Sequence, residues 1–158
     1  MNAPTASTPA PRRIALVAAL HDELQPIRRR LELSAEGERW VGRRDAGRII
    51  AIVTGPGLDA AARATAALLD AEPFDHVLHV GFAGGLDPAL QPGDVLDAGR
   101  VRNEAGQVIA LSSHGSAPLL LSLGQVLTTP TAKRTWWTST GAGAVDTESY
   151  AVAEAATA

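Results

Sequence analysis

Two glutamates stand where a side chain could do acid–base chemistry. Glu23 lies just past an apolar run that ends at Leu20, and Glu148 lies just past a short apolar stretch; both lie where a helical pattern begins. A carboxylate placed over a pocket can act as a general base for water. Because a carboxylate only accepts hydrogen bonds, it also suits a pair of neighbouring hydroxyls, such as those of a ribose. The alternative role of either glutamate is to cap its helix, where a negative charge is favourable.

A glycine-rich loop, Gly81–Gly85, follows the apolar run that ends at Val80. Glycine lets the backbone turn sharply and lets a ligand approach closely. In open α/β sheets, ligands bind beyond the carboxyl ends of the strands. The loop is therefore predicted to form the floor of a small-molecule pocket. The alternative is a plain turn that binds no ligand. Glu23 and Glu148 also follow strands, and the ends of parallel strands share one edge of a sheet, so the three features are expected to converge.

The segment Thr54–Ala60 contains Gly55 and Gly57 in the pattern G-x-G-x-x-A, between an apolar run and a helical pattern. This pattern is typical of dinucleotide-binding loops. The acidic partner of such loops belongs at the end of the next strand, but Asp75 precedes that strand, so binding of a nicotinamide cofactor is disfavoured. Backbone N–H groups at Thr54, Gly55 and Gly57 form a candidate phosphate or carboxylate site. A tight turn without a ligand is the equal alternative.

The sequence disfavours a metal centre. There is no cysteine, which excludes thiolate ligands. His76 and His79 are an odd number of residues apart on one predicted strand, so their side chains point to opposite faces. These two histidines are therefore not expected to form a metal pair.

The first half of the chain reads as a βαβ arrangement. Strands are predicted over 14–20, 38–44, 48–54 and 75–80, with a turn at 45–47. Apolar spacing predicts helices after residues 20 and 57, with Asp22 as the N-cap of the first and Glu72-Pro73 ending the second. Strand–helix–strand order favours a parallel sheet with a right-handed crossover.

The second half is less regular. Weaker strands are predicted over 95–101 and 107–112, a short strand over 142–145, and a helix over 147–158. Residues 119–127 are apolar without a clear period, so helix and strand stay open there. Trp136-Trp137 is interpreted as core plus subunit interface.

Composition limits the classes of protein. The 158 residues suffice for one domain, predicted over 13–158 after a disordered tail at 1–12 rich in Ala, Pro, Ser and Thr. A net charge of −3 offers no footprint for nucleic acid. No run approaches the ~20 apolar residues of a membrane span, and no signal-peptide cleavage site follows the first apolar run. A cytoplasmic protein is expected.

Four blocks in order make the chain resemble the nucleoside phosphorylase/nucleosidase superfamily, close to methylthioadenosine/S-adenosylhomocysteine nucleosidases and hopanoid-associated phosphorylases. They are IALVAALHDEL at Ile14–Leu24, TGPG at Thr54–Gly57, HVGFAGGLDPALQPGDV at His79–Val95, and GAGAVDTESYAVA at Gly141–Ala153. The resemblance implies a three-layer α/β/α fold with a central, mostly parallel mixed sheet. It also implies a homo-oligomer that cleaves the N-glycosidic bond of a purine nucleoside or a 5′-substituted relative, using water or inorganic phosphate. No metal or organic cofactor is implied.

The resemblance assigns roles to individual residues. Glu23 matches the carboxylate that activates water, and Glu148 matches the glutamate that binds the ribose hydroxyls. Phe82, Ala83 and Gly84 match the loop beneath the base and sugar, with Phe82 in place of a small or hydroxyl residue. Thr147 takes the place of a methionine beneath the ribose. The loop of Thr54, Gly55 and Gly57 lies near the nucleophile.

One functional position of the family has no counterpart in these residues. The family's general acid is an aspartate in a Ser-Asp motif, on a strand that follows the helix after Glu148. That strand lies beyond Ala158, so the last strand or strands of the fold are expected to be absent. The alternative expectation is therefore a nucleoside-binding or assembly protein of the same fold with impaired catalysis.

Overall fold

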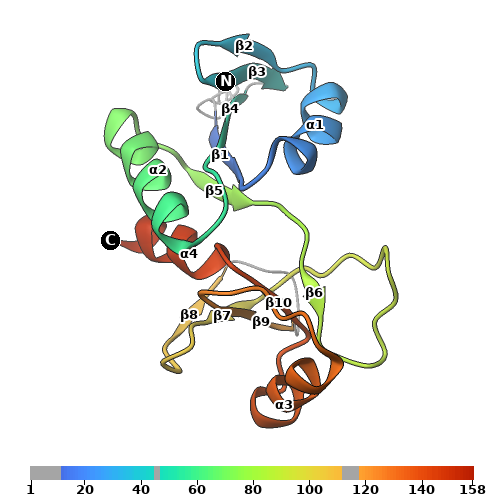
Figure 1. Ribbon diagram of the computed structural model, residues 1–158. Helices are drawn as coiled ribbons and strands as arrows, with labels where there is room; N and C mark the ends of the chain where they lie inside the picture. The colour runs from blue at the N-terminus through green and yellow to red at the C-terminus, as the bar shows by residue number, and fades with distance from the viewer. Residues whose placement is uncertain (1–11, 45–46, 112–117) are drawn as a thin grey trace, which may run out of the picture.

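The first of two sheets is organised around β1 (Arg13–Ala18). A computed structural model describes residues 12–44, 47–111 and 118–158. The strand order is β2 (Ser34–Glu36), β3 (Arg39–Arg44), β4 (Gly47–Val53), β1 and β5 (His76–His79). β1 runs parallel to β4 and β5, whereas β2–β3 and β3–β4 are antiparallel. Figure 1 shows this sheet in blue to green.

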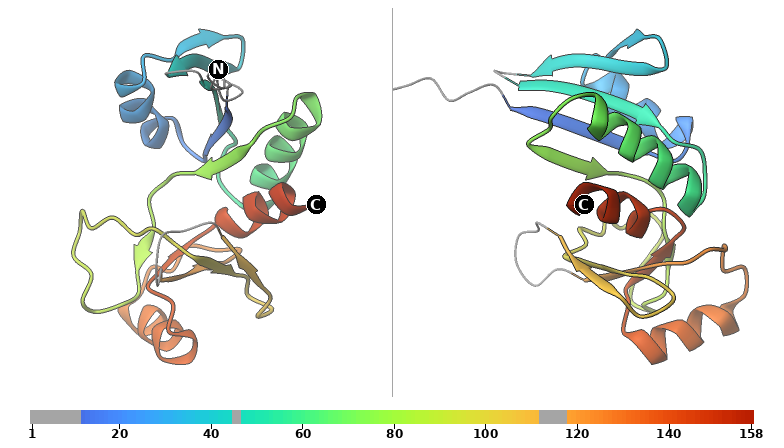
Figure 2. Two further views of the ribbon diagram at one scale, coloured as in Figure 1. Left: turned by 180° about the vertical axis from the view of Figure 1, so that it is seen from behind. Right: turned by 90° about the vertical axis from the view of Figure 1, so that its left-hand side faces the viewer.

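Helices cover both faces of the first sheet. Alternate residues of β1 face opposite ways, as the two-residue period of a strand requires. Leu16 and Ala18 pack against Leu24 of α1 (His21–Arg30). Ala15 and Val17 pack in a cluster with residues of α2 (Leu58–Ala71) and α4 (Ser149–Thr157). The result is a helix–sheet–helix sandwich, in which Figure 2 shows α2 and α4 on the same side of the sheet.

The second sheet has the order β6 (Gly84–Gly85), β10 (Ala144–Asp146), β9 (Leu119–Ser122), β7 (Arg100–Arg102) and β8 (Val108–Ala110). β9 is parallel to both β10 and β7, while the outer pairs are antiparallel. α3 (Pro130–Thr140) contributes Trp136 and Trp137 to the cluster around the buried Leu121. α4 joins the sheets because Val152 packs towards the first and Tyr150 towards the second.

The predicted α/β class, three layers and βαβ order are confirmed, and hydrogen bonding divides the strands between two mixed sheets. The open choice at 119–127 resolves into a strand over Leu119–Ser122. The strand predicted over 95–101 is confined to Arg100–Arg102. Trp136-Trp137 belongs to a helix that the sequence analysis missed, although Thr129 caps it and Pro130 opens it.

One expected helix cap is wrong, and two expected segments lie outside the residues that the structure describes. Asp22 is not the N-cap of α1, because that position belongs to Leu20 and Asp22 lies in the first turn. Most of the predicted tail, 1–11, and the turn at 45–46 lie outside the described residues. Of the helices that the structure describes, none is long and apolar enough to cross a membrane.

Candidate active site

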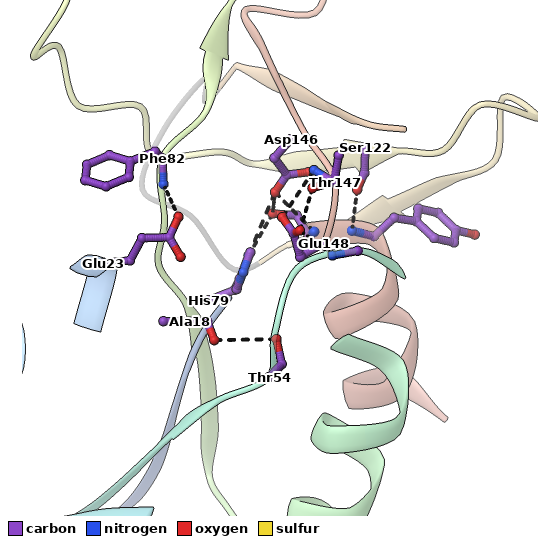
Figure 3. A network of polar contacts seen from close by, with 12 residues as sticks. Ala18, Glu23, Thr54, His79, Phe82, Ser122, Asp146, Thr147 and Glu148 are labelled. Carbon is purple, nitrogen blue, oxygen red and sulfur yellow. Dashed lines mark hydrogen bonds and ion pairs between the residues drawn. The ribbon is translucent and has the colours of Figure 1, made fainter. Parts of the chain in front are cut away.

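Glu23 lies in the first turn of α1 and reaches across to the glycine loop. Its Oε2 accepts a hydrogen bond of 2.8 Å from the backbone N–H of Leu20, which closes the helix start. Its Oε1 accepts one of 2.8 Å from the backbone N–H of Phe82, 59 residues away. Figure 3 shows Glu23 pointing at Phe82. The structure thus brings Glu23 to the predicted loop, and the capping role and the contact with the loop coexist.

The close approach of Glu23 depends on the absence of a side chain at Gly81. A Cβ atom built on Gly81 would lie 2.9 Å from Oε1 of Glu23 and 3.2 Å from its Cδ. Contacts that short do not occur between unstrained atoms, so a residue with a Cβ at position 81 must displace the carboxylate.

We expect Gly81→Ala to move Glu23 without unfolding the chain. The clashing atoms belong to the end of a flexible side chain, so the cost to the free energy of unfolding is expected to be about 1 kcal/mol or less. The amide resonance of Phe82 should shift in an NMR spectrum because it loses its carboxylate acceptor. Gly124→Ala, where the added Cβ meets nothing within 4 Å, should leave it in place. An unshifted Phe82 amide would contradict this geometry.

Glu148 is buried, with 7% of its surface exposed. Its Oε1 accepts a hydrogen bond of 2.7 Å from the backbone N–H of Gly57 and a short one from the hydroxyl of Thr147. Its Oε2 accepts a longer bond of 3.3 Å from the backbone N–H of Thr147. A carboxylate offers about four lone-pair positions. Oε2 therefore keeps acceptor capacity for a ligand.

The backbone N–H groups of the candidate phosphate loop are all engaged within the protein. Thr54 and Gly55 donate to the carbonyls of Ala18 (2.9 Å) and Ala19 (3.1 Å). The N–H of Gly57 donates to Glu148, so in this structure the anion at the start of α2 is the protein's own carboxylate. A φ of +94° at Gly57 suits glycine and aims its N–H at Glu148. The assignment of a phosphate to this loop stays a prediction.

A pocket of about 120 Å³ opens beside Glu148. Four predicted site residues line it: Phe82, Gly84, Thr147 and Glu148. The remaining lining residues are Gln125, Val126, Leu127, Val145 and Asp146. Phe82 does not fill this space, since 76% of its surface is exposed. Glu23 adjoins the pocket through its bond to Phe82, whereas Ala83, Thr54 and Gly55 do not line it.

Asp146 is a site residue that the sequence analysis missed. It ends β10, its side chain is 6% exposed, and it lines the same pocket as Glu148. Its Oδ2 accepts bonds from the backbone N–H (3.1 Å) and the hydroxyl of Ser149, and lies 4.0 Å from Nδ1 of His79. A carboxylate at the end of an apolar strand, two residues before Glu148, was the signal available in the sequence.

Burial raises the pKa of the Asp146 carboxyl above its ordinary value of 3.8. Hydrogen bonding from Ser149, the nearby charge of His79 and the neighbouring hydroxyl of Ser122 oppose this rise in pKa, and the negative charge of Glu148 adds to it. Asp146 thus holds a proton more firmly in the folded chain than in the unfolded one.

We expect the raised pKa of Asp146 to make the free energy of unfolding depend on pH. Above 3.8 and up to its raised pKa, the folded chain binds a proton that the unfolded chain has released, so the free energy of unfolding falls as the pH rises through that window. Asn at this position does not titrate. Urea unfolding of the wild type and Asp146→Asn, from about pH 3 to about pH 7, should show the wild type losing stability relative to the variant. A difference that stays constant or grows with pH would contradict the assignment.

No metal centre is evident in the described part of the chain. Over 12–44, 47–111 and 118–158, no group of three or more His, Asp or Glu side chains is placed to hold a metal ion.

Comparison with known sequences identifies relatives. A family model described as "Phosphorylase superfamily" matches residues 8–115, more than half of the chain. The chain is 31% identical over 112 residues to a 5′-methylthioadenosine/S-adenosylhomocysteine nucleosidase of Bacillus subtilis, covering 67% of this chain and 48% of that protein. It is 39% identical over 61 residues to the enzyme of the same name from Colwellia psychrerythraea, covering 39% of this chain and 25% of that protein. The chain thus spans about half or less of these relatives.

Solved structures share the fold. Futalosine hydrolase of Helicobacter pylori superposes with a TM-score of 0.81 at 18% identity, covering 92% of this chain and 78% of that one. The 5′-methylthioadenosine/S-adenosylhomocysteine nucleosidase of Neisseria meningitidis, in complex with methylthio-immucillin-A, gives 0.80 at 21% identity, covering 92% and 80%. The family match, the two nucleosidase relatives and the common fold lead to one conclusion: this chain belongs to the phosphorylase superfamily.

Proposed function

We propose that the protein binds a purine nucleoside, or a relative substituted at the 5′ position, and cleaves its N-glycosidic bond. The observation that carries the proposal is the pocket in which Glu148 and Thr147 face the glycine loop at Phe82 and Gly84, with Glu23 bonded to the same loop. The names of the similar proteins, which are nucleosidases and a futalosine hydrolase, support this class of substrate.

In the proposed complex, Glu148 holds the sugar. Its Oε2 carries a single weak bond at 3.3 Å, which leaves one acceptor position for a ribose hydroxyl. A second position opens for the neighbouring hydroxyl when the ribose displaces that weak bond. Thr147 lies beneath the ribose, and Phe82, Ala83 and Gly84 lie beneath the base and sugar. The low exposure of Glu148 strengthens such bonds because little water competes for the carboxylate.

The proposed reaction uses the two carboxylates for different tasks. As the bond from C1′ to the base nitrogen breaks, positive charge develops on the sugar, and nearby carboxylates stabilise it. Glu23 accepts a proton from water as the water oxygen bonds to C1′. The base leaves with the electron pair of the broken bond and takes up a proton from solvent water. Inorganic phosphate is the alternative nucleophile, bound near Thr54, Gly55 and Gly57, and the proposal needs no metal or organic cofactor.

A second candidate is a protein that binds nucleosides without turning them over. The ionisable side chains among the pocket-lining residues are Asp146 and Glu148, and both are engaged in bonds within the protein. Neither is free to donate a proton to the departing base. This observation favours binding alone.

One experiment separates the candidates. Methylthioadenosine is incubated with the protein, with and without inorganic phosphate, and released adenine is quantified by chromatography; calorimetry measures binding of methylthioadenosine and adenine. Adenine release in either buffer supports cleavage and identifies the nucleophile, and heat without release supports binding alone. Absence of both, for the wild type and for an exposed-site control, Glu38→Gln, would overturn the proposed function.

We also propose that the chain forms a homo-oligomer in the cytoplasm. Exposed apolar side chains at Phe82, Val95 and Val126 support self-association, with 76%, 95% and 74% of their surfaces exposed. Light scattering of the purified chain tests this, and a monomeric mass at all concentrations would contradict it.

A further inference from the structure

Asp146, Ser149 and His79 form a polar cluster where the two sheets meet. Asp146 ends β10 of the second sheet, Ser149 begins α4, and His79 ends β5 of the first sheet. The hydroxyl of Ser149 contacts both partners: it donates to Oδ2 of Asp146 and lies 2.8 Å from Nδ1 of His79. Figure 3 shows Asp146 and His79 close to Glu148.

The cluster encloses the turn that carries Glu148. Thr147 and Glu148 are the only residues between Asp146 and Ser149 in the sequence. Oδ2 of Asp146 holds the far end of this turn through both the backbone N–H and the hydroxyl of Ser149. Glu148 itself has a non-helical backbone, with φ −134° and ψ −35°. The direction of its side chain is therefore set by how the turn is held.

Asp146 acts through this turn, although it lines the pocket. Oδ2 is taken by Ser149, and Oδ1 is buried without a hydrogen-bond partner in the described residues. A buried atom of this kind cannot reach a ligand unless the wall moves. The two other members of the cluster come from different elements, His79 from β5 and Ser149 from α4. Next to Ser149, the backbone N–H of Tyr150 donates to the hydroxyl of Ser122 on β9 at 3.2 Å.

We infer that Asp146 is a positioning residue: with Ser149 and His79 it holds the 146–149 turn so that Glu148 spans from the N–H of Gly57 to the pocket. The inference rests on the proposed function for its ligand. The two segments that it joins are 91 residues apart, so no local interaction replaces this bond. A loosened turn lets Glu148 withdraw from Gly57 and from the sugar together.

The test uses Asp146→Asn, which keeps the shape of the side chain and removes its charge. The matched control is Asp94→Asn, because Asp94 also accepts a backbone N–H, from Gln91 at 2.8 Å, but on an exposed loop. Calorimetry should show Asp146→Asn binding adenosine about tenfold more weakly, the loss expected for about one charge-assisted hydrogen bond. Binding of adenine, which has no ribose, should stay within about twofold. The control should change neither.

A second measurement needs no ligand. Amide hydrogen exchange at Gly57 reports directly on whether Glu148 accepts its N–H. We expect exchange at Gly57 to be about tenfold faster in Asp146→Asn, with exchange in the core strand β4 unchanged. Ser149→Ala, which removes only the hydroxyl, should move both readouts in the same direction by less, and it provides the test if Asp146→Asn does not fold.

The outcomes are distinct. If the wild type binds adenosine and both variants bind it equally well, the positioning role is overturned. Equal weakening for adenosine and adenine, with unchanged exchange at Gly57, would also overturn it, because the role would then be structural. If the wild type binds neither compound, the proposed function fails, while exchange at Gly57 still decides whether Asp146 holds Glu148.

Discussion

Replacing Glu148 with glutamine is expected to weaken binding of adenosine by about 10- to 100-fold. Hydrogen bonds to a charged acceptor contribute roughly 1.5–3 kcal/mol each, and each 1.4 kcal/mol is about tenfold in affinity. The glutamine side chain would keep one oxygen, which can still accept the N–H of Gly57. Its amide group would replace the oxygen that is proposed to face the ribose, and that group donates where an acceptor is needed.

The control for this prediction is the ligand rather than a second variant. Adenine lacks the ribose hydroxyls, so its affinity for Glu148→Gln should stay close to that for the wild type. Calorimetry with both ligands gives the comparison, and circular dichroism verifies that the variant folds. If adenosine and adenine lose affinity equally, Glu148 does not bind the ribose hydroxyls, and the prediction is wrong.

Replacing Glu23 with glutamine is expected to reduce cleavage of methylthioadenosine by about 100- to 10,000-fold, the usual contribution of a general base. Binding should change little, because in this proposal Glu23 contacts the attacking water. The rate of adenine release should therefore fall, while the affinity for methylthioadenosine measured by calorimetry should stay near that of the wild type.

Glu23 also closes the start of α1, which requires a stability control. Loss of a helix cap costs about 1 kcal/mol, and glutamine can accept only one of the N–H groups of Leu20 and Phe82. Urea unfolding should record such a cost, and rates are compared per folded molecule. Glu38→Gln, on the exposed surface, should change neither stability nor rate. A Glu23→Gln variant that retains the wild-type rate would remove Glu23 from the mechanism.

Local patterns in the sequence determined much of the fold and part of the site. The apolar run at 14–20 predicted β1, and the spacing of Leu24, Ile27 and Leu31 predicted α1. Both predictions succeed because the spacing of apolar residues over a short segment distinguishes a strand from a helix. Glu23, Glu148 and the glycine loop were expected to converge at one edge of a parallel sheet. They do come together, but Glu148 follows β10 of the second sheet, so a shared edge accounts only for Glu23 and the loop. The sequence analysis missed the helix over Pro130–Thr140 because this helix has no regular apolar spacing. Only its first residues, the capping Thr129 and Pro130, are typical of a helix start.

The tertiary structure alone decided which contacts form between those strand ends. The N–H of Gly57 meets Glu148 across 91 residues, Glu23 meets Phe82 across 59, and His79 meets Ser149 across 70. Such pairings depend on strand register and on how α2 and α4 pack, and both are set by long-range burial that no local pattern encodes. The sequence by itself singled out Glu23 and Glu148 as candidates and passed over Asp146, because the contacts of Asp146 depend on packing. Packing decided that Glu148 lies at the start of α2 and that Asp146 lines the pocket beside it.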